Sequence, residues 1–259
     1  MSALQAAHGS RGPRLPGDER SRQHGDPLIQ AAELECGELE LLGLLPAASN
    51  YTLLARLDTG EEPALVVYKP QRGETPLWDF PMGTLCRREV AAFLVSEAAG
   101  WGFVPPTVLR DGPLGPGAVQ VFVPHDFGIT AFDLLVHKPR VMRGVVLFDV
   151  AVNNADRKAG HVFEDASGGI WAVDHGICFH EEPKLRTVLW DFSGYPIPPE
   201  EHLPLERLCR ALDGDLGAAL ESLLAPAEIS ALRERSRRIC EAECFPEPGP
   251  GRPYPWPPI

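Results

Sequence analysis

The sequence predicts an α+β protein of two lobes that enclose a cleft. Short strand patterns with a single helix fill the chain before residue 124, and helical patterns dominate after it. The 259 residues allow one large domain or two small lobes. Hydrophobic residues make up 44% of the chain, which is enough to build a core.

The first half contains short strand patterns separated by turn residues. Residues 37–45 and 50–57 are β-like runs on either side of a bend of small residues, and the Asp-Thr-Gly sequence of residues 58–60 is a hairpin turn signal. A helix is expected over 84–99, because its apolar residues recur at the spacing of one helical face. Further strands are expected at 64–69, 107–110 and 118–123.

Helical patterns begin at Pro139 in the second half and are interrupted twice. A run of polar residues at 153–160 predicts a loop, and an apolar run at 170–173 predicts a strand. Three closing helices are expected at 204–213, 215–224 and 227–244.

The two ends of the chain differ in composition from the part between them. Residues 1–27 carry too few apolar side chains to offset chain entropy, which predicts a disordered tail. The Pro-rich residues 246–259 predict an extended, solvated tail; docking of Tyr254 and Trp256 on a partner or on the body is the alternative. The chain between the tails divides into an N-lobe, 28–123, and a C-lobe, 124–245.

Charge and cysteine usage exclude several classes of protein. A total of 24 Lys and Arg against 36 Asp and Glu gives a net charge of −12, which disfavours binding to nucleic acids or to anionic membranes. No apolar run reaches the roughly 18 residues that a membrane span needs. The beginning of the chain lacks the apolar segment of a secretory signal, and the six cysteines are scattered. We therefore expect a cytoplasmic protein with reduced thiols.

A lysine and a glutamate are predicted to meet inside the protein. Lys69 ends the apolar strand pattern at 64–69, where an unpaired ammonium is seldom found. Glu89 falls on the inward face of the helix at 84–99. Together they can neutralise one another and hold a polyphosphate, although either residue alone is more typical of a solvated surface side chain.

Two aspartates follow apolar segments. Asp156 lies in the polar run after a helical pattern, where a carboxylate can orient an attacking hydroxyl or accept its proton. Asp174 ends an apolar strand pattern two residues before Gly176, and a carboxylate there can bind a hard cation. By itself, Asp174 before Gly176 is more typical of a residue that forms a turn.

These four residues occur in the order, and on the element types, that kinase chemistry requires. With the motifs YKP (68–70), NADR (154–157) and DHG (174–176), the chain resembles the phosphatidylinositol 3/4-kinase superfamily, particularly its bacterial outliers and the HipA-type kinases. It is most similar to an actinobacterial family of uncharacterised relatives, which shares the stretch at 184–190. The resemblance covers residues 30–245 and implies a two-lobed protein-kinase-like fold with a strand-rich N-lobe and a helix-rich C-lobe.

The resemblance implies a role for each site residue. Lys69 contacts the phosphates of ATP with Glu89 as its ion-pair partner, Asp156 is the catalytic residue, and Asp174 ligates Mg²⁺. The remaining roles are loop support by Asn154 and Arg157, covering of the phosphates by Ser49 and Asn50, and the hinge beside the adenine by Gln120, Phe122 and Val123.

His161 departs from the pattern of the superfamily, which usually has an Asn metal ligand five residues after the catalytic Asp. Mg²⁺ binds imidazole poorly, whereas Mn²⁺ accepts nitrogen more readily. If His161 is a metal ligand, the site prefers Mn²⁺ and weakens below about pH 6.5. The alternative is that His161 begins a strand and only packs there.

The sequence therefore predicts a phosphotransferase that uses ATP and Mg²⁺, with Mn²⁺ as the alternative metal. Its acceptor is an unidentified hydroxyl of a protein or a small molecule, because no basic run suggests docking on a lipid surface. Acceptor recognition is expected in residues 177–199. The alternative function, favoured by His161, is a nucleotide-binding pseudokinase or a regulatory interaction module without turnover.

Overall fold

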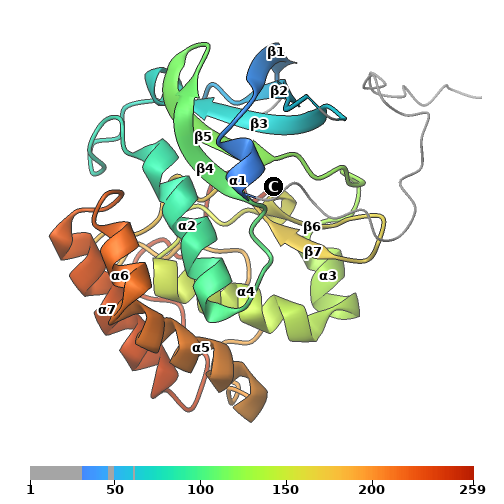
Figure 1. The fold of residues 1–259 in the computed structure, drawn as a ribbon. Coiled ribbons are helices and arrows are strands. Elements are labelled where there is room, and N and C mark those ends of the chain that lie inside the picture. Colours follow the sequence, from blue (N-terminus) through green and yellow to red (C-terminus); the bar gives the residue numbers. More distant parts are fainter. Residues whose placement is uncertain (1–30, 46–49, 61) are drawn as a thin grey trace, which may run out of the picture.

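A five-stranded antiparallel sheet forms the first half of the computed structural model, which describes residues 31–45, 50–60 and 62–259 (Figure 1). The strand order is β1-β2-β3-β5-β4, and a short helix, α1 (Ala31–Leu34), precedes it. The strands are β1 (Glu38–Leu44), β2 (Leu53–Asp58), β3 (Ala64–Pro70), β4 (Thr107–Gly112) and β5 (Gly115–Val121). The register pairs Lys69 of β3 with Ala118 of β5, which places the lysine at the end of a central strand.

Helix α2 (Leu85–Ala99) lies between the sheet and the helices of the second half (Figure 1). It ends at Gly100, whose φ of 78° is left-handed and whose N–H bonds to the carbonyls of Ser96 and Glu97. The helix packs against α5 (Pro199–Leu212) as well as against β4 and β5.

The second half is mainly helical. Three of its helices begin with a proline, which is favoured in the first turn because its missing N–H is not needed there. Its elements are α3 (Ala131–His137), α4 (Pro139–Val152), η2 (Ala159–His161), β6 (Val162–Glu164), β7 (Ile170–Ala172), α5, α6 (Asp215–Leu220) and α7 (Pro226–Cys240), whereas η1 (Gln71–Gly73) follows β3 in the first half.

Four helices differ from the sequence-based expectation, and one of them, α6, ends at Leu220 and not at the expected residue 224. Helix α3 was not predicted; at its start the carboxylate of Asp133 accepts hydrogen bonds from the N–H and the hydroxyl of Thr130. Helix α5 begins at Pro199 and continues through Pro204, because the buried Leu205, Leu208 and Leu212 secure it to the core. Helix α7 ends at Cys240, so the predicted extension to residue 244 is wrong.

The buried apolar side chains form two clusters. One fills the sheet and includes Leu53, Val66 and Val119. The other combines α2 with the second half, so that Ala91 and Phe148 belong to the same cluster. Helix α2, which the expected boundary at 123 assigns to the N-lobe, therefore shares its core with the helices that follow.

The Pro-rich residues 246–259 are largely exposed, as expected of a solvated tail, but a few of them contact the body near the end of the chain. Pro255 is buried, and carbonyls of Pro253 and Pro258 accept hydrogen bonds from the body. Tyr254 and Trp256 are nevertheless exposed, so these aromatic rings are not what secures the segment. The predicted disordered tail, 1–27, lies outside the described residues.

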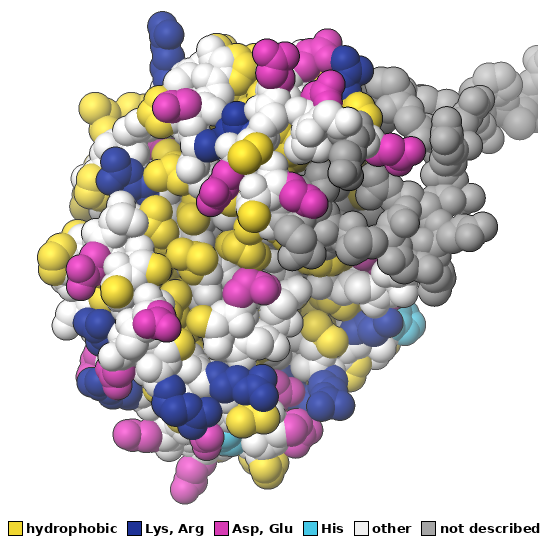
Figure 2. All heavy atoms as spheres, in the orientation of Figure 1, with side chains coloured by type: hydrophobic (Ala, Val, Ile, Leu, Met, Phe, Trp, Pro, Cys, Tyr) yellow, Lys and Arg dark blue, Asp and Glu magenta, His cyan; other side chains and the backbone are white. Residues whose placement is uncertain are grey.

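The surface mixes charges of both signs. Figure 2 shows acidic and basic side chains interspersed over the face that carries α2 and α5–α7, with apolar side chains between them. Within the part of the chain that the structure describes, no helix is long and apolar enough to cross a membrane. All six cysteines are free thiols.

Candidate active site

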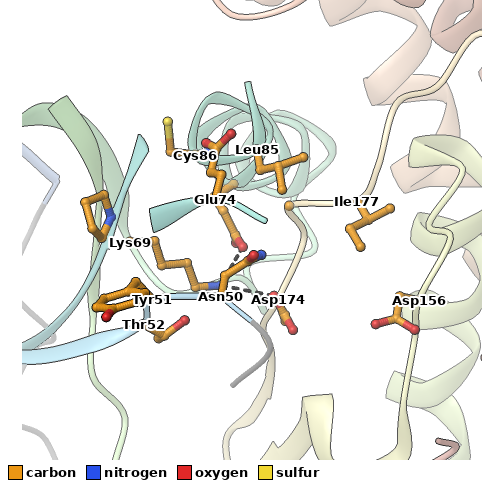
Figure 3. A pocket seen from close by; sticks show the side chains of 13 residues that line it. Asn50, Tyr51, Thr52, Lys69, Glu74, Leu85, Cys86, Asp156, Asp174 and Ile177 are labelled. Carbon is orange, nitrogen blue, oxygen red and sulfur yellow. Dashed lines mark hydrogen bonds and ion pairs between the residues drawn. The ribbon is translucent and has the colours of Figure 1, made fainter. Parts of the chain in front are cut away.

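A cleft lies where the end of β3 and the start of α2 face two loops of the second half (Figure 3). Lys69 and Asp174 point toward one another on one side of it, and Asp156 faces them from the other side. The lining residues are Asn50, Tyr51, Thr52, Lys69, Pro70, Glu74, Leu85, Cys86, Glu89, Asp156, Asp174, Gly176 and Ile177.

Lys69 forms two ion pairs in this cleft. Its Nζ lies 2.5 Å from Oε1 of Glu89 and 3.3 Å from Oδ1 of Asp174. Burial disfavours the charge of the ammonium, but the attraction of Glu89 and Asp174 exceeds this effect and raises the pKa of Lys69 above its ordinary value. The predicted pair of Lys69 with Glu89 is therefore confirmed, and Asp174 extends it to a triad.

Glu89 also joins helix α2 to the loop that carries Asp174. Its second oxygen, Oε2, accepts a hydrogen bond of 3.1 Å from the backbone N–H of His175. The preceding residue, the buried Arg88, donates to the carbonyl of Cys178 at 2.6 Å and to Glu228 of α7 at 2.5 Å. Both contacts cross from α2 to the second half, so the position of Glu89 is set from two sides.

The loop of Asp156 is built on a buried ion pair. Arg157 donates from Nε and Nη2 to the two carboxylate oxygens of Asp149, both at 2.8 Å. Asn154 donates to the same carboxylate at 2.9 Å and accepts the N–H of Asp156 at 3.0 Å. The expected loop support by Asn154 and Arg157 is thus present in the geometry, but Asp149, which the sequence did not single out, is the group that both residues bind.

Arg157 connects this loop to the loop of Asp174. Its guanidinium donates to the carbonyl of Val173 at 2.9 Å and to Nε2 of His175 at 2.7 Å. Since a guanidinium only donates, His175 accepts with a neutral imidazole. Burial, together with the charge of Arg157, lowers the pKa of His175 well below its usual range.

The two aspartates are in different electrostatic environments. Burial raises the pKa of Asp156, although Lys158 opposes the shift from 3.5 Å. Partial desolvation in the cleft also disfavours the charged form of Asp174, but Lys69, followed by His161, outweighs it and lowers the pKa of Asp174. Asp174 adopts a left-handed backbone with a φ of 63°, which is strained for a residue with a side chain and typical of functional loops.

His161 points toward Asp174. Its Nε2 lies 3.4 Å from Oδ2 of Asp174, whereas its Nδ1 faces the N–H of Lys158 at 3.4 Å. It ends the turn η2 and does not begin β6, so the alternative that it starts a strand is wrong. Burial lowers the pKa of His161 to about 4. The pH of about 6.5, below which metal binding was expected to weaken, is therefore too high.

The donors present fit a divalent ion that also binds phosphate. Asp174 and His161 are the neighbouring candidate ligands, and within residues 31–45, 50–60 and 62–259 no group of three or more His, Cys, Asp or Glu could hold an ion by itself. Mg²⁺ at phosphate sites is held by one or two carboxylates, with substrate oxygens and water completing its shell. The half-exposed carboxylate of Asp174 suits such a partly filled site.

Of the residues expected around the base and the phosphates, some line the cleft and others do not. Asn50 lines the cleft and accepts the N–H of Thr75 at 2.8 Å, whereas Ser49 lies outside the described residues. The side chain of Gln120 is buried and donates to Thr107, away from the cleft.

The two hinge residues after β5 already use main-chain groups. The N–H of Phe122 bonds to the carbonyl of Leu65 at 3.0 Å, and the carbonyl of Val123 bonds to the ring of His125 at 2.9 Å. Neither Phe122 nor Val123 lines the described cleft, so their contact with a base remains a prediction.

Glu74 is a cleft residue that sequence reasoning missed. Its Oε1 accepts the N–H of Cys86 in the first turn of α2 at 2.9 Å, where a carboxylate is favoured by the helix dipole. Burial, reinforced by Glu74, raises the pKa of the Cys86 thiol to about 12. No sequence signal identifies this glutamate, because it lies in the irregular connection between β3 and α2.

Comparison with solved structures identifies the fold. The Golgi casein kinase superposes with a TM-score of 0.50 at 15% sequence identity, covering 81% of this chain and 74% of that one. The chain therefore has a kinase-like fold, as expected. The Helicobacter pylori proinflammatory kinase CtkA is also similar, with a TM-score of 0.48 at 11% identity over 85% of this chain and 96% of that one. None of these likenesses points to the phosphatidylinositol 3/4-kinases or to HipA in particular.

Comparison with curated sequences identifies the family. No protein-family model matches the chain. Protein Rv2133c of Mycobacterium tuberculosis is 41% identical over 261 residues, which cover 87% of this chain and 94% of that protein. An identity of this level over nearly the whole length means that the chain belongs to the same family as Protein Rv2133c.

Proposed function

We propose that the protein is a kinase-type phosphotransferase that moves the terminal phosphoryl group of ATP to a hydroxyl acceptor. One observation carries this proposal: Lys69 lies between Glu89 at 2.5 Å and Asp174 at 3.3 Å, in a cleft that Asp156 also lines. The kinase-like fold supports it, since the similar solved structure is a kinase.

Each residue has a role that its contacts support. Lys69 binds nucleotide phosphates as a point charge, and Glu89 keeps its ammonium directed into the cleft. Asp156 orients the acceptor hydroxyl and takes its proton as the new bond to phosphorus forms. Asp174, with His161 beside it, would hold a divalent ion, which neutralises phosphate charge when bound.

The acceptor is proposed only as a class, a protein or small-molecule hydroxyl. Residues 177–199 follow the loop of Asp174, and Ile177 lines the cleft directly. Arg186 N–H bonds to the carbonyl of Asn154 at 2.9 Å, so this segment runs beside the loop of Asp156. A relationship to the phosphatidylinositol 3/4-kinases or HipA, and a cytoplasmic location, belong to the same proposal.

Measurement of ADP formation from ATP tests the activity. Purified protein with Mg²⁺ or Mn²⁺ should form ADP, and Lys69→Met should abolish this while leaving the thermal unfolding temperature nearly unchanged. Lys138→Met is the matched control, because Lys138 pairs with Glu164 on the surface and should be dispensable. ADP formation that persists in Lys69→Met would contradict the proposal.

The second candidate is a nucleotide-binding pseudokinase. The position of His161, 3.4 Å from Asp174, favours it, because an imidazole replaces the oxygen ligand usual in kinases. ATP binding by calorimetry without phosphoryl transfer to a library of protein and metabolite acceptors would select this candidate. Transfer to any acceptor that Asp156→Asn abolishes would exclude it.

A further inference from the structure

The end of the chain is hydrogen-bonded to the expected acceptor segment at two places, through residues 243–245 and through Pro253. Near its start, N–H of Ile197 bonds to the carbonyl of Glu243 at 2.8 Å. Phe245 then exchanges two bonds with the segment, to the carbonyl of Tyr195 at 2.9 Å and from the N–H of Gly194 at 3.1 Å. The direction is antiparallel, as the bridge of residues 196 and 244 shows.

Further along, the same stretch reaches the loop of Asp156. The carbonyl of Pro253 accepts both the N–H of Thr187 at 3.0 Å and the indole Nε1–H of Trp190 at 3.2 Å. The carbonyl of Pro258 accepts the N–H of Ala159 at 2.9 Å, three residues after Asp156. We call residues 243–258 the strap.

The two segments under the strap are also bonded to each other. Arg157 donates its N–H to the carbonyl of Arg186 at 3.0 Å and accepts from the N–H of Val188 at 3.1 Å. Thr187 lies between these two contacts and turns its own N–H to the strap. Backbone hydrogen bonds therefore join three segments to one another: the loop of Asp156, residues 186–188 and the strap.

The donors that the strap satisfies are shielded from water. Ala159 is fully buried and Thr187 is 3% exposed. A buried N–H without an acceptor costs about 1–3 kcal/mol. Extended Pro-rich chain makes no internal backbone hydrogen bonds, so its carbonyls are available to such donors.

From these contacts we infer that the strap is a positioning element of the active site: it fixes the loop of Asp156 against the acceptor segment. The positions of Asp156 and of Trp190 then depend on backbone carbonyls that are distant in sequence, Pro258 for the loop of Asp156 and Pro253 for Trp190. The catalytic part of this inference rests on the proposed function, whereas the ordering of the two segments does not.

Hydrogen–deuterium exchange on two shortened chains tests the ordering. A chain that ends at Trp256 loses the acceptor of Ala159, so the Ala159 amide should exchange at least about 10-fold faster while Thr187 stays protected. A chain that ends at Gly251 should release both amides. Ile259→Ser is the control, because that side chain is 71% exposed and should leave both amides protected.

Amides of β2 and β3 serve as internal references, since these two strands are hydrogen-bonded to each other within the sheet. Their exchange should be unchanged in both shortened chains. Unchanged exchange at Ala159 and Thr187, or equal acceleration over the whole protein, would overturn the inference. The second result would mean that the strap contributes only to global stability.

Kinetics on the same variants separates the strap from the proposed function. The chain ending at Trp256 should lose at least about 10-fold in kcat, because misplacement of a catalytic group by about 1 Å can cost roughly 100-fold. Its KM for ATP should stay within about two-fold, since the strap contacts neither Lys69 nor Glu89. Failure of the intact protein to form ADP would remove the kinase proposal but leave the exchange result decisive for the strap.

Discussion

Asp156 and Asp174 face one cleft, and their different contacts support the different roles proposed for them. Asp174 is paired with Lys69 and lies beside His161, in agreement with its proposed role in phosphate and metal binding. Asp156 lies across the cleft with Lys158 as its partner, on the side of the acceptor segment.

The division of roles predicts opposite results for two conservative substitutions. Asp156→Asn should lower turnover by about 10²–10⁴-fold with nearly unchanged ATP affinity, because its role is exercised in the transition state. Asp174→Asn should remove the metal-dependent part of ATP affinity. Calorimetric titration with ATP, with and without Mg²⁺, measures both; equal loss of affinity in the two variants would contradict the assignment.

His161 should set the preference among divalent ions. Its Nε2 is 3.4 Å from Asp174, and nitrogen is accepted more readily by Mn²⁺ than by Mg²⁺. His161→Asn should therefore shift nucleotide affinity toward Mg²⁺. The measurement is the ratio of ATP dissociation constants in the two metals, and an unchanged ratio would show that His161 is not a ligand.

Arg157 is the residue on which the loop most depends for stability. Its guanidinium is fully buried and makes bidentate contact with the carboxylate of Asp149. Arg157→Met should lower the free energy of unfolding by about 3–5 kcal/mol, because it leaves a buried charge without its partner. Urea denaturation measures the loss, and Arg157→Met combined with Asp149→Leu should recover part of it. A loss below about 1 kcal/mol would mean that water enters to solvate Asp149.

At the scale of elements, helix α2 determines whether the cleft is assembled. It carries Glu89, it is anchored through Arg88 to Cys178 and Glu228, and its core face packs with the second half. The helix ends at Gly100, and this end fixes where the chain turns toward β4.

Gly100 should therefore be sensitive to substitution. Gly100→Ala places a side chain in a left-handed backbone, which costs roughly 1–2 kcal/mol in the free energy of unfolding. Gly249→Ala is the matched control, because no atom lies within 4 Å of an added Cβ there. Thermal and urea unfolding measure the difference; equal stability of the two variants would show that the left-handed turn at the end of α2 relaxes.

Periodicity and turn residues predicted the elements whose signals are local. The strands around Lys69 and the helix of Glu89 were expected within a few residues, because short apolar strand patterns, turn residues and an apolar helical face are all visible in sequence. Helix α3 was missed because it is short, and the strap was missed because its packing depends on hydrogen bonds to distant segments.

For the whole molecule, histidines with a lowered pKa predict a loss of stability in mild acid. Burial lowers the pKa of the half-buried His125, which stacks on Phe163, and those of His161 and His175. In the unfolded chain all three titrate near their ordinary pKa of about 6.5, so the unfolded state binds more protons below this pH. The stability is therefore complete above pH 6.5 and should fall as the pH drops toward 5.5.

The slope of the free energy of unfolding against pH reports the number of protons taken up on unfolding. Each proton contributes about 1.4 kcal/mol per pH unit to this slope. Urea denaturation between pH 7.5 and 5.5 measures it, and His125→Phe should reduce the slope by keeping the ring but removing the titrating group. A free energy of unfolding that does not change over this range would contradict the prediction.

The sequence by itself determined the residue types and their order: a strand lysine, a helix glutamate, a loop aspartate and an aspartate at a strand end. These follow from local patterning, because each residue's element can be read from its neighbours. Tertiary structure alone decided which groups meet. The bond of Glu89 to His175, the buried Asp149 under Arg157, and the strap on Ala159 join residues far apart in the chain, and no local pattern encodes such contacts.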